Sequence, residues 1–149
     1  SDNYLILLVD ISTLNKKSGS LQNKDLKGFT HIEIQFDEFS VVSRYYEINI
    51  LFGLPKIEFD AVLAHELVHI WLAEKNYSFS DIFKEGFCNL ASALIYNNDD
   101  TKFSRIHLNN MLESDDPVYG EGYRKCRILL AQYGWNNLIY NVSTKSVPF

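Results

Sequence analysis

A chain of 149 residues with 46% hydrophobic residues is long enough to bury one core without disulfide bonds, so we expect a single domain over residues 1–149. A formal net charge of −5 argues against a nucleic-acid partner or an anionic membrane surface, because both require a basic patch. No apolar run reaches the length of a membrane span, and no signal peptide opens the chain. We therefore expect a cytoplasmic protein with no membrane partner. The chain starts at Ser1 without a methionine, which suggests a trimmed chain or a piece of a longer protein.

The first third of the chain predicts strands and a loop. Residues 4–9 form a continuous apolar run, which predicts a buried strand. Residues 15–28 are polar and contain glycines and lysines, as is typical of a loop. Residues 30–36 alternate between apolar and polar, which indicates a half-buried strand with His31 on its solvated face. The pattern of residues 45–52 fits a strand or the start of a helix equally well.

Helical patterns dominate the rest of the chain. Pro55 leaves the following residues free to begin a central helix, which we place at residues 58–75 and end at residues 76–78. Ser80 or Asp81 is expected to cap a second helix that ends at residues 97–98. Its apolar residues at helical spacing predict a core stripe made of Phe87, Leu90, Ala91, Leu94 and Ile95.

Two further helices are expected near the C-terminus. Asp99 or Asp100 is expected to cap a third helix, residues 101–112. A fourth begins after Gly120 or Gly122 and ends at Gly134, with a short further helix at residues 135–142. The order of elements predicts an α+β fold, in which a small N-terminal sheet packs on a helical part.

The two cysteines, Cys88 and Cys126, lie far apart in the sequence. They form neither a disulfide framework nor a spacing typical of cysteine zinc sites. Both fall in segments with a helical pattern, so we expect each to be a small buried residue rather than a reactive one.

The central helix carries the sequence His65-Glu66-Leu67-Val68-His69, an H-E-x-x-H motif. Residues four apart lie on the same face of a helix, so His65 and His69 can bind one metal ion while Glu66 lies beside them. This spacing is the signature of zinc metalloproteases. The surrounding residues are apolar nearly all round, which predicts a buried helix in which ionisable side chains are costly unless they bind a metal. The alternative is a pair of core histidines with ordinary hydrogen bonds.

A catalytic zinc site needs a third protein ligand and an open position for water. Glu85 is the best candidate, because it lies early in the second helix, which can return antiparallel to the first. Gly86 next to it removes a side chain where helices must approach closely. Asn89, one turn further on, can accept the second ring N–H of a ligand histidine. The alternative for Glu85 is a solvated glutamate in the first turn of a helix.

An ordered set of motifs resembles the peptidase domain of the DA1 family. The set comprises ILFGLP at residues 50–55, LAHELVHIWL at 63–72 and EGFC at 85–88, flanked by LLVD at 7–10 with LN at 14–15 and by ESD at 113–115 with PVYGEGYR at 117–124. The resemblance implies a zincin-like fold and one Zn²⁺ ion held by His65, His69 and Glu85. It also implies that Glu66 is the catalytic glutamate and that the enzyme is a zinc endopeptidase.

The resemblance further implies a link to ubiquitin. The plant members carry ubiquitin-interacting and LIM modules ahead of the peptidase domain, are activated by ubiquitination, and cleave growth-regulating proteins. A protein substrate, and ubiquitin or a ubiquitinated protein, are therefore the expected partners. We expect Glu66 to accept a proton from water and Tyr119, at a matching position, to donate to the oxyanion. A packing role is the alternative for Tyr119, and His107 is a weaker candidate for the same donor.

Two other functions compete with the peptidase. One is a protein-binding module that recruits ubiquitin or another partner without turnover, and the other is a purely structural zinc site. Glu66 argues against the binding module, because a protein without catalysis has no need of a glutamate inside an apolar helix. A structural site would require a fourth protein ligand, which the sequence pattern does not supply.

Overall fold

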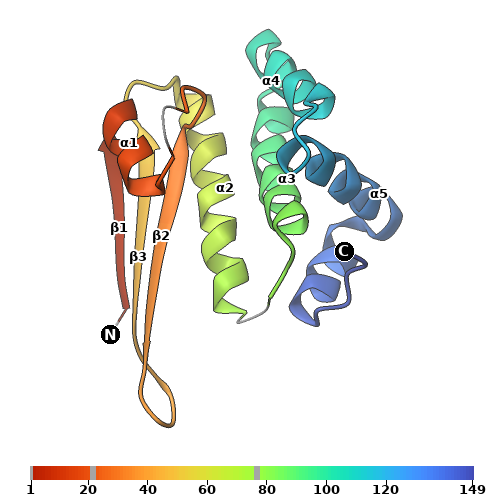
Figure 1. Cartoon of the computed structure of the whole chain (residues 1–149). Helices are drawn as coiled ribbons and strands as arrows, with labels where there is room; N and C mark the ends of the chain where they lie inside the picture. The colour runs from red at the N-terminus through yellow and green to blue at the C-terminus, as the bar shows by residue number, and fades with distance from the viewer. Residues whose placement is uncertain (1, 21–22, 76–77) are drawn as a thin grey trace.

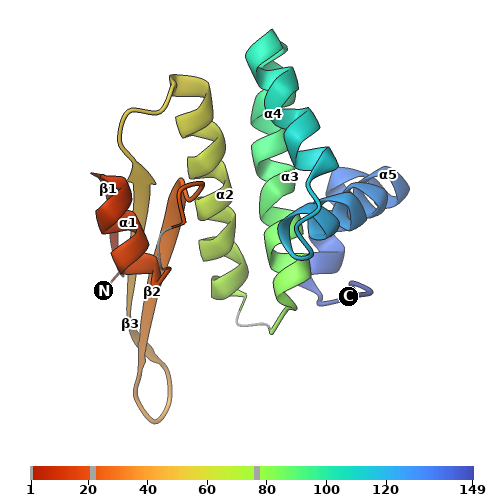
Figure 2. The same cartoon turned by 45° about the horizontal axis from the view of Figure 1, so that its top comes forward.

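The computed structural model describes residues 2–20, 23–75 and 78–149. Within these ranges the chain has the expected α+β organisation, with three strands and five helices. The elements in chain order are β1 (Asp2–Val9), α1 (Ile11–Ser18), β2 (Gly28–Phe36), β3 (Val41–Leu51), α2 (Lys56–Glu74), α3 (Asp81–Asp99), α4 (Lys102–Glu113) and α5 (Tyr119–Ser143). Figure 1 shows α2 between the sheet and the group formed by α3, α4 and α5, and the turned view in Figure 2 shows the same layers.

The sheet has the strand order β1-β3-β2, so β3 is its central strand. β1 runs parallel to β3, whereas β2 is antiparallel to it, with Gly28 opposite Ile50 and Thr30 opposite Ile48. The buried side chains of β3 pack against Ile70 of α2 and form one of two core clusters. Residues 45–52, whose pattern fitted strand or helix, therefore belong mostly to a strand, because this stretch pairs on both sides.

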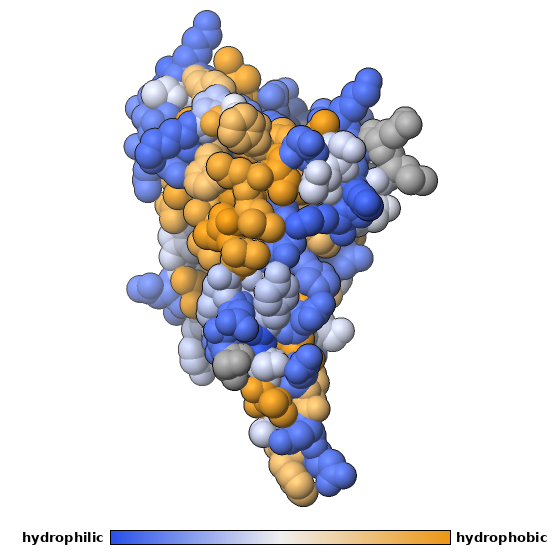
Figure 3. Space-filling model, turned by 90° about the vertical axis from the view of Figure 1, so that its left-hand side faces the viewer, coloured by the Kyte–Doolittle hydropathy of each residue, from blue (hydrophilic) through white to orange (hydrophobic). Residues whose placement is uncertain are grey.

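β1 is not the buried strand that its apolar run predicts. Tyr4, Ile6 and Leu8 are 62%, 52% and 56% exposed. β1 lies at the edge of the sheet, and α2 packs on β2 and β3 instead. Seen from the β1 side, the surface carries a broad apolar area (Figure 3). The sequence run alone cannot distinguish a central strand from an edge strand that is left uncovered.

The predicted loop at residues 15–28 is wrong in its first part, where α1 forms. Asp10 caps this helix by accepting a hydrogen bond from Thr13 N at 2.7 Å, and Gly19 ends it in the left-handed conformation. Lys17 of α1 donates to Glu47 at 2.8 Å and to buried Asn49 at 2.9 Å, which ties the helix to β3. These contacts explain how so polar a segment becomes helical. Residues 21–22 lie outside the described residues.

α2 begins two residues earlier than expected, directly after Pro55, and ends at Glu74. The expected end at residues 76–78 falls mostly outside the described residues. The helix is covered on two sides, with Ile70 in the sheet cluster and Leu72 in the helical cluster. It is not buried all round, because Leu67 is 48% exposed on a side that neither layer covers.

α3 begins as expected with Ser80, whose hydroxyl accepts from Phe83 N at 3.1 Å. It ends at Asp99, one residue beyond the expected end at residues 97–98. The expected core stripe is only partly correct: Phe87 and Leu90 are buried, but Leu94 is 43% exposed. α4 is capped by Thr101 rather than by an aspartate, because Asp100 already ends α3 in a left-handed conformation.

α5 starts at Tyr119 and contains a break at Gly134, whose φ of 73° and ψ of 166° are not helical. This agrees with the expected end at Gly134 and a further short helix. Gly86 of α3 and Gly122 of α5 face each other so closely that a Cβ on either would collide with the backbone of the other helix. Cys126 is fully buried beside this contact. No helix in the described ranges is long and apolar enough to cross a membrane.

Candidate metal centre and active site

A cavity of about 1010 Å³ runs along α2 and is lined by residues of β2, α3, α4 and α5. The two histidines and the glutamate of the H-E-x-x-H motif line it, as do Glu85 and Tyr119. The structure therefore gathers every residue that the sequence assigned to the site around one cavity.

Three candidate ligand atoms converge on the α3 side of α2. Nε2 of His65 lies 3.1 Å from Oε2 of Glu85, and Nε2 of His69 lies 3.4 Å from the same oxygen. The two Nε2 atoms are 3.2 Å apart. The atoms thus form a nearly equilateral triangle, with two corners from one helix and the third from the next.

This triangle has the dimensions of a zinc site. Nitrogen and carboxylate ligands bind zinc at about 2.0–2.2 Å in tetrahedral geometry, so neighbouring ligand atoms stand about 3.4 Å apart. Two imidazole nitrogens facing each other at this distance carry lone pairs that repel unless a proton or a cation lies between them. The donor set of two imidazoles and one carboxylate suits zinc, so these three residues fit the ion.

Asn89 orients the first histidine. Its Oδ1 lies 2.9 Å from Nδ1 of His65, so Nδ1 carries the proton and the lone pair of Nε2 points to the ligand triangle. Burial by itself lowers the pKa of His65, but the bond to Glu85 and the charges of Glu66 and Glu85 outweigh it and raise that pKa. Burial likewise raises the pKa of Glu85, yet the bonds from both histidines lower it to about 2. The carboxylate is therefore ionised, as a ligand must be.

Glu66 faces the other side of α2, toward β2. Its carboxylate accepts a hydrogen bond from the Thr30 hydroxyl at 2.5 Å, and the residue is only 5% exposed. Gly28, on the same strand, leaves room for this carboxylate, since a Cβ there would lie 2.7 Å from Oε1 of Glu66. Sequence reasoning missed both β2 residues, because the contact joins segments far apart in the chain and no local pattern marks it.

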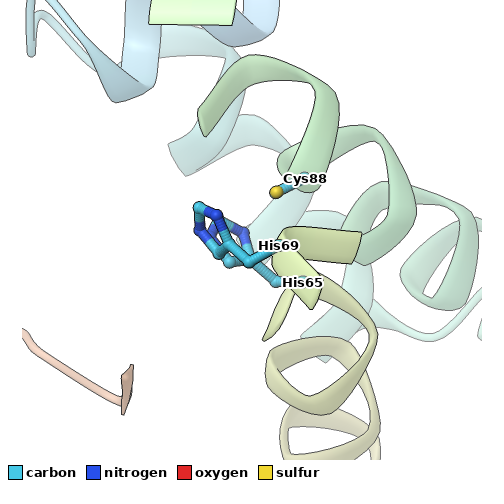
Figure 4. Close-up of side chains that lie close together, drawn as sticks. All are labelled: His65, His69 and Cys88. Carbon is cyan, nitrogen blue, oxygen red and sulfur yellow. The ribbon is translucent and has the colours of Figure 1, made fainter. Parts of the chain in front are cut away.

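Cys88 also lies beside the histidines, which the sequence did not predict. Its Sγ and one ring nitrogen from each of His65 and His69 all lie within 4.8 Å of one another, and Figure 4 shows the thiol next to the paired rings. Cys88 is fully buried, as expected, and burial followed by the charges of Glu85 and Glu66 raises the pKa of the free thiol. The spacing Glu-x-x-Cys, which puts both residues on one face of α3, was the available signal.

Tyr119 stands at the start of α5 and lines the same cavity. It is 47% exposed, so it is not a packing residue of the core. Partial burial and then the charges of Glu85 and Glu66 raise the pKa of its phenol to about 12. The hydroxyl therefore keeps its proton at neutral pH and can donate it, although the role at an oxyanion stays a prediction.

His107 belongs to a separate cluster at the far end of the cavity. Its Nε2 lies 3.5 Å from Oε2 of Glu58, which also pairs with Lys27, and its ring stacks on Tyr96 at 5.0 Å. Glu58 precedes Glu66 by about two turns of α2. These contacts engage His107 away from the ligand triangle, and none of the described contacts joins it to His65 or His69.

Comparison with known proteins places the chain in a family. The model of the DA1-like family, described as Protein DA1, matches residues 9–101. The chain therefore belongs to the DA1-like family, as its motifs predicted.

Two plant proteins are similar to parts of the chain. Protein DA1 of Arabidopsis thaliana is 28% identical over 124 aligned positions, which cover 64% of this chain and 23% of that protein. LIM domain-containing protein HDR3 of Oryza sativa subsp. japonica is 44% identical over 48 positions, which cover 32% of this chain and 10% of that protein. The chain thus spans less than a quarter of the length of these relatives. No solved structure matches it significantly.

Proposed function

We propose that this chain is a zinc-dependent endopeptidase of the HExxH…E type with a zincin-like fold, acting on protein substrates. The observation that carries the proposal is the triangle of His65, His69 and Glu85, whose edges of 3.1, 3.2 and 3.4 Å match those of a three-ligand zinc site. A carboxylate that is not part of the triangle, Glu66, lines the same cavity. Three ligands and one adjacent free carboxylate are the parts that metal-assisted hydrolysis requires.

The residues divide the chemistry between them. A zinc ion held by the triangle would supply Lewis-acid polarisation and would lower the pKa of a water molecule toward neutrality. Glu66 accepts the proton of the attacking water and returns it to the leaving amine. Thr30 holds the Glu66 carboxylate in place through its hydroxyl. Tyr119 donates its phenolic proton to the oxyanion that develops at the scissile carbonyl.

The edge of the sheet offers a place for the substrate. β2 is the edge strand on the side of the cavity, and it carries Thr30, which contacts Glu66. Among the described residues the outer edge of β2 pairs with no strand. An extended peptide can bind as an added strand through backbone hydrogen bonds, which brings one of its peptide bonds beside Glu66. This arrangement favours an endopeptidase acting on unfolded or flexible segments of proteins.

The family resemblance adds regulation by ubiquitin to the proposal. We expect the isolated chain to cleave generic peptides poorly and to respond to ubiquitin or to a ubiquitinated partner. The test combines metal analysis of the purified protein with cleavage assays with and without ubiquitin. We expect one zinc per chain and cleavage that depends on zinc and on Glu66.

Two outcomes would contradict the proposal. An anomalous-scattering map of zinc-replete protein that shows no metal at His65 and His69 would contradict the zinc site itself. Full activity of Glu66→Gln on a validated substrate would contradict the mechanism in which Glu66 transfers the proton. Binding of ubiquitin without any cleavage would favour a recruiting module on the same fold.

A further inference from the structure

We infer that Cys88 is a fourth protein ligand of the zinc ion, so that the resting site is closed. The inference rests on the proposed function, since it concerns the regulation of the same metal site. A site with three protein ligands keeps a position open for water, whereas four protein ligands fill a tetrahedral zinc ion and leave none. Ligation by Cys88 would therefore hold the enzyme in an inactive form.

The elements bring the thiol to the metal triangle from the same helix as Glu85. Cys88 follows Glu85 by three residues on α3, so both side chains leave the helix on the face toward α2. His65 and His69 meet them from α2 at a spacing of four residues. Two adjacent helices thus present two potential ligands each.

The Cys88 sulfur lies close enough to the histidines to reach the zinc ion by a short movement. The Cys88 sulfur lies within 4.8 Å of a ring nitrogen of both histidines. Zn–S bonds of about 2.3 Å and Zn–N bonds of about 2.0 Å place such ligand atoms about 3.5 Å apart. A sulfur–nitrogen separation at the 4.8 Å limit would thus have to shorten by on the order of 1 Å. A change in the Cys88 side-chain torsion and a small shift of the bound ion can provide this.

The surroundings of the Cys88 thiol favour its binding to the zinc ion. Cys88 is fully buried, and none of the described hydrogen bonds involves its sulfur. A thiol that binds zinc loses its proton to solvent, and the Zn–S bond replaces the bond to water. Activation would reverse this exchange: water returns to the fourth position and the sulfur takes up a proton.

Cys126 provides a matched control, because it is also a fully buried cysteine facing α3. Its Sγ lies near Phe83 O at 3.9 Å, on the side of α3 that packs against α5. It therefore belongs to the helical core and not to the metal site. A serine at either position changes one buried atom, so the two variants carry a similar cost in packing.

The test is the absorption spectrum of the chain reconstituted with Co²⁺ in place of zinc. Visible d–d bands report that the ion is bound, and a near-ultraviolet sulfur-to-cobalt charge-transfer band reports a thiolate ligand. We expect both in the unmodified chain. Cys88→Ser should lose the charge-transfer band and keep the d–d bands, whereas Cys126→Ser should keep both. Zinc-loaded Cys88→Ser should also cleave faster than the unmodified chain before any activator is added.

The outcomes separate this inference from the proposed function. Cobalt bound without a charge-transfer band in the unmodified chain would overturn ligation by Cys88 and leave the three-ligand peptidase site intact. A charge-transfer band that persists in Cys88→Ser but disappears in Cys126→Ser would assign the thiolate ligand to Cys126. This result would also overturn ligation by Cys88. No cobalt binding at all would overturn the metal site, and with it the proposed function.

Discussion

The two sides of α2 carry residues suited to different steps, metal binding on one side and proton transfer on the other. The side toward α3 carries His65 and His69, which meet Glu85, Asn89 and the thiol of Cys88. The side toward β2 carries Glu66, which accepts a hydrogen bond from the Thr30 hydroxyl of that strand. Groups that can hold a cation thus converge from the helical layer, and the group that can move a proton is held by the sheet. Both functions use residues of α2, but their partners come from different elements, α3 for the metal and β2 for the proton, so each can be disturbed without the other.

The largest effect is expected from His69→Ala, which removes a ligand from the α3 side. Zinc affinity should fall by more than about 100-fold, since even outer-shell partners of a metal cost about 10–100-fold when mutated. At a zinc concentration near 100 times the original Kd, stabilisation of about 2.7 kcal/mol by the ion should also disappear. Metal analysis and thermal unfolding with and without zinc measure the two effects.

His31→Ala is the matched control for that variant. His31 lies on the exposed face of β2, where it contacts Glu33 at 2.8 Å. It should leave zinc content and the zinc-dependent shift in Tm unchanged. Equal losses in both variants would show that the effect of His69→Ala is not one of ligation.

Glu66→Gln should have the next largest effect and should act on the β2 side only. It removes the carboxylate that accepts a proton and leaves the three ligands in place, so turnover should fall by about 10²- to 10⁴-fold at unchanged zinc content. Steady-state cleavage and metal analysis of the same preparation check this. Glu33→Gln, an exposed carboxylate on β2, is the control. Loss of zinc in Glu66→Gln would make Glu66 a ligand or its support and would erase the proposed division between the two sides.

Asn89→Ala should weaken the α3 side without abolishing it. The variant removes the oxygen that fixes the ring of His65, so zinc affinity should fall by about 10–100-fold. Competition with a chelator of known affinity measures this change. Asn97→Ala, at an exposed position of the same helix, should bind zinc like the unmodified chain. An unchanged affinity in Asn89→Ala would mean that the ring of His65 is held by its packing alone.

The smallest effect is expected from Thr30→Val on the β2 side. The substitution keeps the shape of the side chain but removes a hydrogen bond to a carboxylate, so turnover should fall roughly tenfold, near the lower end of the cost of such bonds. Thr30→Ser retains the hydroxyl and should restore most of the rate. If Thr30→Val lowered zinc affinity as strongly as turnover, the two sides of α2 would be coupled.

The sequence predicted the α3 side well because its signals are local. Helical spacing brings His65 and His69 together, and the placement of Glu85 and Asn89 one turn apart on the next helix follows from the same period. The close approach expected at Gly86 was wrong in its partner: the helix that approaches there is α5 and not α2. The H-E-x-x-H motif together with the helical period therefore led to Glu85 and Asn89, which the structure brings to the two histidines.

The β2 side and the sheet could not be predicted equally well, because their contacts are not local. Thr30 meets Glu66 across a long stretch of chain, and no pattern around either residue marks the other. β1 has the composition of a buried strand and yet lies exposed at an edge, since the sequence does not say which strands α2 will cover. α1 depends on contacts of Lys17 with β3, which the polar composition of the segment conceals.

The close approach of Gly86 and Gly122 has a consequence for the entropy of metal binding. The backbone of α5 at Gly122 lies directly against Gly86, the residue that follows Glu85. No side chain lies between the two helices there that could change conformation. α3 therefore cannot move away from α2 without pressing into the backbone of α5, and Glu85 keeps its place relative to the histidines in the metal-free protein. When the ligand side chains are already in position, binding of the ion costs little conformational entropy. The affinity for the ion is therefore higher. A methyl group at Gly122 would act from the far side of α3, weakening zinc binding without touching any residue of the site.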